Sequence, residues 1–202
     1  MSDNHLELLR AYQARPDRGP IYGTQWGDPD EHPRLREVRD RFIRPYLDFD
    51  HTALEIGPGG GRWTRYLLGF RRLYAVEPYR ELLDELATAF RAPHLVPVLN
   101  SGCDLPGIAA GSIDYVFSYS VFVILDPRLI AGYLRALFAA TRDGANIVLN
   151  YADIRRPGAR EEGQTDTDPA RMHRLIEEAG FTIAEEDSAL LPLGVVVRFR
   201  KP

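Results

Sequence analysis

A glycine-rich loop with an acidic residue just before it is the segment of this sequence best suited to bind a ligand. Residues 55–64 read Glu-Ile-Gly-Pro-Gly-Gly-Gly-Arg-Trp-Thr, after a short apolar run and before a helical pattern. Glycines at 57, 59 and 61 allow a sharp turn and leave room for a ligand against the backbone. A plain strand-to-helix turn has a similar local sequence, so the loop needs support from other residues.

That support comes from Glu77, which lies 20 residues after Gly57 at the end of the next predicted strand. A carboxylate in this register can accept hydrogen bonds from both ribose hydroxyls of an adenosyl group. The alternative is a solvated carboxylate at a strand end, and the register with the glycine loop favours the binding role.

The spacing of the glycines separates two classes of adenosine cofactor. A dinucleotide loop carries glycine at its first, third and sixth positions, whereas the sixth position here is Arg62. Glu55 would repel a pyrophosphate, but it suits a ligand with an amine, a sulfonium and no phosphate. S-adenosylmethionine (SAM) is such a ligand. A dinucleotide-dependent oxidoreductase would also need a second catalytic region, for which the chain has no room.

The elements that position this loop follow an alternating pattern. Strands are predicted at residues 52–56, 72–76, 95–99, 112–118, 145–151, 181–186 and 193–201, and helices at 3–14, 34–47, 62–69, 79–90, 127–141 and 169–179. This order predicts a parallel sheet with helices on both faces. Only residues 187–192 separate the last two strands, so these must be antiparallel. The expected fold is α/β and Rossmann-like: a doubly wound, mostly parallel seven-stranded sheet that ends in an antiparallel hairpin.

Composition excludes several other classes of protein. The 25 basic and 29 acidic residues give a net charge of −4, which argues against a nucleic-acid partner. Cys103 is the single cysteine, so no internal disulfide can form and a reducing compartment is expected. No apolar run reaches the roughly 18 residues of a membrane span. No histidine–carboxylate spacing suggests a metal site. We therefore expect a cytoplasmic protein that neither associates with a membrane nor binds a metal.

Three segments together resemble the class I SAM-dependent methyltransferases. Residues 53–64 resemble their first motif, residues 74–78 the second, and residues 102–106 with 111–118 the loop and strand beside the adenine. The similarity covers about residues 21–202. It implies a small-molecule methyltransferase with SAM as cofactor, in which residues 1–33 form a helical lid and residues 34–202 the methyltransferase domain.

The resemblance also implies a role for each matching position. The glycine loop and the acid before it would hold the methionine end, Glu77 the ribose, and Pro78 or Tyr79 one side of the adenine. Residues 101–103 would close on the adenine edge, and residues 118–119 would border the sulfonium. The implied cofactor-binding residues are Glu55, Gly57, Pro58, Gly59, Gly61, Glu77, Pro78, Ser101, Gly102, Cys103, Ser118, Tyr119, Tyr22 and Trp26.

The sequence departs from the family pattern just after the fourth predicted strand. Many relatives carry an acid followed by a histidine there, of the type Asp-Val-Phe-Val-His-Leu, but residues 120–125 read Ser-Val-Phe-Val-Ile-Leu. The usual candidate for a general base is therefore missing. Three interpretations stay open: an oxygen or nitrogen acceptor that needs no base, a base elsewhere in the chain, or SAM binding without catalysis in a sensor or partner subunit.

Candidate catalytic residues are Tyr22, Tyr119, Ser120 and Tyr151. His32 and His173 could approach the cleft from the lid and from the last helix, although an ordinary surface position is more common for histidine. Arg155 and Arg156 follow the fifth strand near the expected cleft mouth. They would either recognise a carboxylate or phosphate on the acceptor or lie in an exposed loop. Because SAM is intrinsically reactive, the protein's main task would be to position the nucleophile.

Overall fold

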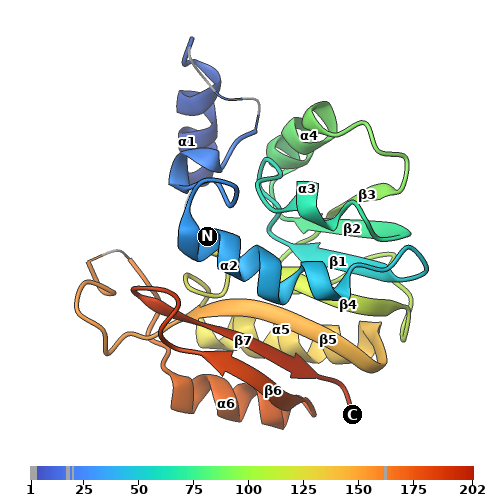
Figure 1. The fold of residues 1–202 in the computed structure, drawn as a ribbon, viewed down its shortest axis with the longest axis vertical. Coiled ribbons are helices and arrows are strands. Elements are labelled where there is room, and N and C mark those ends of the chain that lie inside the picture. The colour runs from blue at the N-terminus through green and yellow to red at the C-terminus, as the bar shows by residue number, and fades with distance from the viewer. Residues whose placement is uncertain (1–3, 17–18, 20, 162) are drawn as a thin grey trace.

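The structure is a computed structural model that describes residues 4–16, 19, 21–161 and 163–202. Its centre is one seven-stranded sheet with the strand order β3-β2-β1-β4-β5-β7-β6 (Figure 1). The strands are β1 (Thr52–Ile56), β2 (Arg72–Glu77), β3 (Leu95–Leu99), β4 (Ile113–Ser118), β5 (Thr141–Ala152), β6 (Thr182–Asp187) and β7 (Gly194–Arg200). Strands β1 to β5 run parallel, and β7 is antiparallel to both β5 and β6. This confirms the mostly parallel sheet with an antiparallel end.

Helices cover both faces of the sheet. They are α1 (Asn4–Gln13), α2 (Pro33–Phe42), α3 (Thr64–Leu67), α4 (Arg80–Ala89), α5 (Pro127–Ala140) and α6 (Pro169–Glu178), with 3₁₀ turns η1 (Thr24–Trp26) and η2 (Arg44–Tyr46). Helices α5 and α6 begin at the residues that the sequence predicts. Each has an aspartate cap followed by proline at the first helical position. No helix in the described part of the chain is long and apolar enough to cross a membrane.

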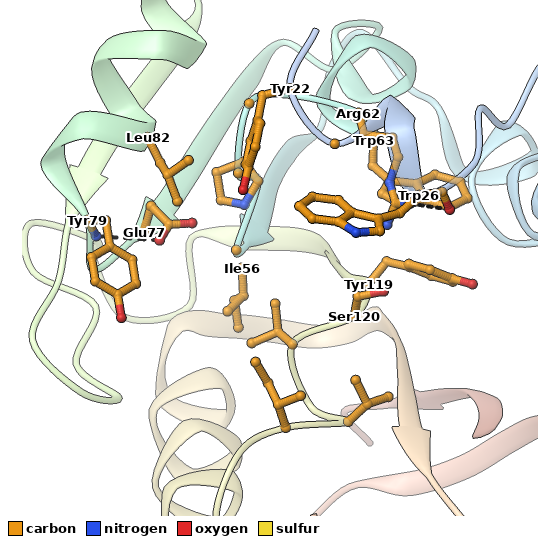
Figure 2. A pocket seen from close by; sticks show the side chains of 18 of the residues that line it. Tyr22, Trp26, Ile56, Arg62, Trp63, Glu77, Tyr79, Leu82, Tyr119 and Ser120 are labelled. Atoms are coloured by element: carbon orange, nitrogen blue, oxygen red, sulfur yellow. Dashed lines mark hydrogen bonds between the residues drawn. The ribbon is translucent and has the colours of Figure 1, made fainter. Parts of the chain in front are cut away.

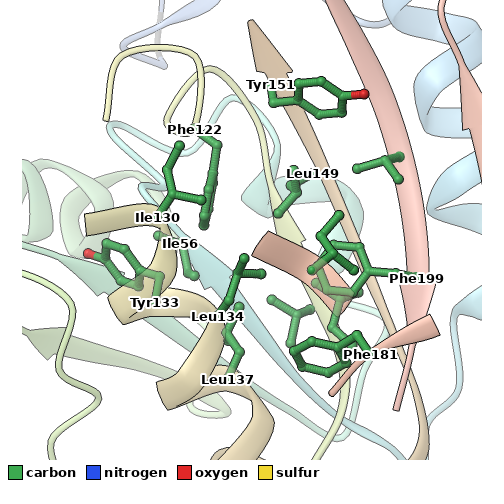
Figure 3. Close-up of a cluster of buried hydrophobic side chains, with 14 of the residues drawn as sticks. Ile56, Phe122, Ile130, Tyr133, Leu134, Leu137, Leu149, Tyr151, Phe181 and Phe199 are labelled. Atoms are coloured by element: carbon green, nitrogen blue, oxygen red, sulfur yellow. The ribbon is translucent and has the colours of Figure 1, made fainter. Parts of the chain in front are cut away.

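The two faces of the sheet carry separate hydrophobic layers, because successive side chains of a strand point to opposite sides. Helices α5 and α6 pack on one face through a large cluster that includes Leu54, Val116 and Leu149 (Figure 3). Helices α2 and α3 pack on the other face, against Ala53, Leu73 and Phe117 among others, and α4 covers Ala75 on that same side. This double cover fixes the carboxyl ends of β1, β2 and β4.

Two predicted helices are shorter than the sequence pattern suggests. The helix expected at 34–47 ends at Phe42 and resumes as the η2 turn. Pro45 explains the break, because its ring clashes with the carbonyl four residues earlier and it lacks an N–H. The helix expected at 62–69 is reduced to the single turn α3. The positive φ angles of Gly59 and Gly61 keep the loop non-helical before it.

Strand β5 is longer than predicted. It begins at Thr141, directly after α5, and its pairing with β4 shifts register between Ile113 and Tyr115. Gly144 has φ +80° inside this irregular stretch, a backbone conformation that other residues adopt only with strain. The Arg-Asp-Gly segment at residues 142–144, which breaks the local apolar pattern, is therefore an irregular part of the strand and not a separate turn.

Candidate functional site

A cavity of about 470 Å³ opens where β1, β2 and β4 end (Figure 2). The glycine loop forms its floor, and the segment between α1 and α2 reaches it from the other side. Nine of the predicted cofactor-binding and catalytic residues line this cavity: Tyr22, Trp26, Gly57, Pro58, Gly59, Glu77, Pro78, Tyr119 and Ser120. The other predicted residues are absent from its lining: Glu55, Gly61, Ser101, Gly102, Cys103, Ser118 and Tyr151.

The glycines of the loop differ in how much space surrounds the position where a side chain would begin. A Cβ atom on Gly57 would overlap Val121, and one on Gly61 would overlap Phe90. Gly60, which the sequence analysis did not single out, lies equally close to Tyr22. Of these four glycines only Gly59 faces open space: its φ is +54°, and no atom of the described residues lies within 4 Å of an added Cβ. Close packing of the chain on itself therefore explains three of these glycines, and Gly59 is the one that leaves room in the cavity.

Glu77 ends β2 next to the glycine loop and is only 5% exposed. Its carboxylate accepts hydrogen bonds from the backbone N–H groups of Gly59 and Tyr79. Burial nevertheless raises its pKa to about 7. A carboxylate offers about four lone-pair sites, so capacity for further donors is left on the cavity side.

Glu55 lies in β1 directly before the loop and is 2% exposed. Its carboxylate accepts a hydrogen bond of 2.6 Å from the Thr64 hydroxyl. Burial raises its pKa to about 8, and the nearby charge of Glu77 contributes to the shift. The structure thus places a second buried acid next to the cavity without exposing it there.

The residues after β4 divide between structure and cavity. The Ser118 hydroxyl donates to the Ile56 carbonyl at 3.0 Å and ties β4 to β1, so it does not face the cavity. Tyr119 does, and burial raises its pKa to about 12. Ser120 has a φ of +65°. Among the described residues it is the only one other than glycine with a positive φ. Its backbone N–H donates to the Asn150 side chain at 2.7 Å, which holds this strained conformation in place.

Residues 101–103 form a loop held by its own hydrogen bonds. The Asn100 amide donates to the Gly102 carbonyl, to the Asp104 carbonyl and to the Tyr133 hydroxyl. The Cys103 sulfur packs against Gly132 of α5. The structure therefore places this loop beside the cavity wall, where the aromatic ring of Tyr133 is the lining group.

Several predicted residues lie away from the cavity. Tyr151 is fully buried, and its hydroxyl donates to Glu186, which also contacts His173 at 2.5 Å. Tyr151, a predicted catalytic candidate, therefore does not line the cavity, because it shares the strand face of Leu149, which packs on α5 and α6 (Figure 3).

The arginine pair and His32 are also outside the cavity lining. Arg155 pairs with Asp153, and Arg156 donates to the carbonyl groups of Leu191 and Ser188. These contacts hold the loop after β5 against the β6–β7 connection. His32 is the residue that precedes α2.

Comparisons with known proteins fit this architecture. Residues 54–149 match a family model described as a methyltransferase domain. The N-methyltransferase NodS of Bradyrhizobium japonicum, solved with S-adenosylhomocysteine (SAH), is 18% identical, with a TM-score of 0.73 and full coverage of both chains. A SAM-dependent methyltransferase of Mesorhizobium loti is 14% identical, with a TM-score of 0.69 and coverage of 85% of this chain and 99% of that one. The geranyl diphosphate C-methyltransferase of Streptomyces coelicolor is 13% identical, with a TM-score of 0.68 and coverage of 96% and 88%.

No curated protein matches the sequence. At these identities the solved structures establish the fold, and the family model assigns a methyltransferase domain to residues 54–149. Both agree with the glycine loop and with the acid at the end of β2. Residues 54–149 are therefore a methyltransferase domain, set in the fold that solved SAM-dependent methyltransferases share.

Proposed function

We propose that this protein transfers the methyl group of SAM to an oxygen or nitrogen atom of a small molecule. The observation that carries the proposal is the cavity itself, which combines a buried acid at one end with apolar and aromatic walls elsewhere. Those walls include Leu35, Trp26, Val123, Ile124 and Leu125. Enclosed pockets of this size and lining are typical of small-molecule sites.

The residues present suit SAM. Glu77 would accept the ribose hydroxyls, the open space beside Gly59 would take the methionine end, and Tyr79 with Leu82 would flank the adenine. Glu55 lies behind the glycine loop, where its negative charge would balance the amine and the sulfonium of the methionine end. When bound, SAM supplies a methyl group that is already activated by the sulfonium. The chain's own residues orient the acceptor and keep water out.

We propose that catalysis depends on positioning and uses no general base from the segment after β4. Ser120 and Ile124 line the cavity there, and neither side chain accepts a proton near neutral pH. Burial raises the pKa of Tyr119 to about 12 and that of Tyr22 above its ordinary value, so both phenols stay protonated. An amine or an acidic hydroxyl would be a suitable acceptor.

We also propose that residues 1–33 act as a lid over this site. The α1 residues Leu9 and Tyr12 pack with Tyr22 and with Leu82 of α4, so the segment bridges the cavity. Tyr22 and Trp26 form its inner surface.

Two measurements test the proposed function. Calorimetry should detect binding of SAM and SAH, and a radiolabel screen should detect transfer to a small-molecule acceptor that gains one methyl group. Absence of SAM and SAH binding would refute the proposal. Tight binding with no transfer to any acceptor would favour a SAM sensor or partner subunit.

A further inference from the structure

Arg62 is a buried cation in the cavity wall, directly after the glycine loop. It is 8% exposed and lines the cavity. Among the described residues, its guanidinium makes one hydrogen bond, from Nη1 to the Trp26 carbonyl at 3.2 Å. It also lies over the rings of Trp63 and Tyr119, at 5.9 Å and 5.4 Å from their centroids. In the part of the chain that the structure describes, no carboxylate forms an ion pair with it.

Other half-buried or buried arginines nearby do have acidic partners. Arg65 pairs with Asp28, and Arg39 pairs with Asp30 and Asp40. A guanidinium offers five N–H donors and stays charged in proteins, so Arg62 keeps most of its donors free. Asp28 and Glu55 attract its charge from a distance, but neither forms an ion pair with it. Burial lowers the pKa of Arg62, which reflects the cost of that position. A charge of this kind is expected where a ligand supplies the partner.

Two further donors point to the same conclusion. The Tyr22 hydroxyl and the Trp63 indole N–H are buried and make no hydrogen bond to any described residue, and both side chains line the cavity. In the close-up, Arg62, Trp63, Trp26 and Tyr119 gather on one side, opposite Glu77 (Figure 2). The donors of Arg62 and Trp63 therefore lie at one end of the cavity and the acid at the other, with Tyr22 between them.

Resting on the proposed function, we propose that Arg62 is the carboxylate-binding residue of this cavity. A single guanidinium balances a single negative charge, and its planar fork matches a carboxylate in two parallel hydrogen bonds. The aromatic rings on either side exclude water and strengthen that pairing. The carboxylate belongs either to the methionine end of the cofactor or to the methyl acceptor, and each source has a distinct signature.

The cofactor arm compares SAH with its decarboxylated analogue by calorimetry on wild type, Arg62→Met and Arg65→Met. If Arg62 holds the cofactor carboxylate, Arg62→Met weakens SAH by at least about tenfold and leaves the analogue within about threefold. Arg65→Met is the matched control, because Arg65 already pairs with Asp28. It is expected to lower the melting temperature without changing the preference for SAH over the analogue.

The acceptor arm uses benzoate and benzamide as probes at saturating SAH. If the carboxylate belongs to the acceptor, Arg62→Met leaves SAH affinity within about threefold and weakens benzoate, but not benzamide, by at least about tenfold. If Arg62→Met leaves SAH affinity within about threefold and does not change benzoate binding, the proposal is overturned. Failure of wild type to bind SAH would instead refute the proposed function.

Stability separates a binding role from a structural one. Because Arg62 is an unpaired buried charge, the cofactor-free Arg62→Met protein is expected to melt no lower than wild type. Arg62→Lys keeps the charge and should retain more SAH or benzoate affinity than the methionine variant. A large drop in melting temperature for both variants, with equal loss of binding, would make Arg62 a structural residue and overturn the proposal.

Discussion

Glu77→Gln separates the cost of burying a carboxylate from its use in binding. The amide has the same shape and keeps one acceptor oxygen, which the backbone N–H groups of Gly59 and Tyr79 would share. It removes a charge that burial disfavours, as the pKa rise from 4.5 to about 7 shows. The native state therefore holds this proton more tightly than the unfolded state does.

The sign and size of the effect follow from linkage. Between pH 4.5 and about 7 the unfolded state releases the proton first, so wild-type stability falls as pH rises through this window. The full shift corresponds to about 3 kcal/mol. Without cofactor, Glu77→Gln is expected to match wild type below pH 4.5 and to exceed its free energy of unfolding by up to about 3 kcal/mol above pH 7.

Urea unfolding of both proteins at several pH values measures this difference, and calorimetry measures SAM binding. Affinity should fall at least about tenfold, because each hydrogen bond from a ribose hydroxyl to the carboxylate contributes about 1.5–3 kcal/mol. Glu81→Gln on the exposed side of α4 is the control and should change neither property. A stability difference that does not grow with pH would refute the burial argument. Unchanged SAM affinity would refute the ribose assignment.

Three further predictions concern the loop, the turn after β4 and the lid. Gly59→Ala and Gly111→Ala should each cost about 1 kcal/mol because both positions have positive φ and open surroundings, but only the first should weaken SAH in calorimetry; equal binding would show that the loop makes no contact. Ser120→Gly should raise the free energy of unfolding by about 1 kcal/mol by relieving φ +65°. Ser120→Ala should slow turnover less than about tenfold, and a loss of several hundredfold with intact SAM binding would reveal a chemical role. SAH should slow proteolysis between α1 and α2, and equal cleavage rates with and without it would count against a lid.

The sheet could be predicted largely from local pattern. The predicted bounds of β1 and β3 agree with the structure, because apolar runs bounded by breakers encode strand length directly. The hairpin follows from connection length alone. The insertion of β7 between β5 and β6 depends on pairing between distant segments, such as Leu149 with Val197, and no local signal specifies it.

The site was predictable where its residues are tied to the loop by short stretches of chain. Gly59 and Glu77 follow from the spacing between two strand ends, and both line the cavity. Ser118 and Tyr151 show where prediction from sequence stops. The sequence places each residue on a strand, but it does not indicate that the hydroxyl groups bond to Ile56 and Glu186 instead of facing the cavity. Arg62 shows a second limit. In the sequence it is only a departure from dinucleotide spacing, and the structure is needed to show that it is buried without an ion pair among the described residues.

The charges around the cavity explain why these residues are costly in the free protein. Burial raises the pKa of both Glu55 and Glu77, and the charge of Glu77 adds to the shift of Glu55. Burial lowers the pKa of Arg62, which Asp28 and Glu55 offset only in part. Well-packed apolar residues at these positions would give a more stable free protein, since buried charges without close partners are unfavourable. SAM carries ribose hydroxyls, whose hydrogen bonds Glu77 can accept, and a carboxylate, which Arg62 can pair with, so it suits both ends of the cavity at once. The arrangement is therefore better explained by complementarity to such a ligand than by any contribution to folding.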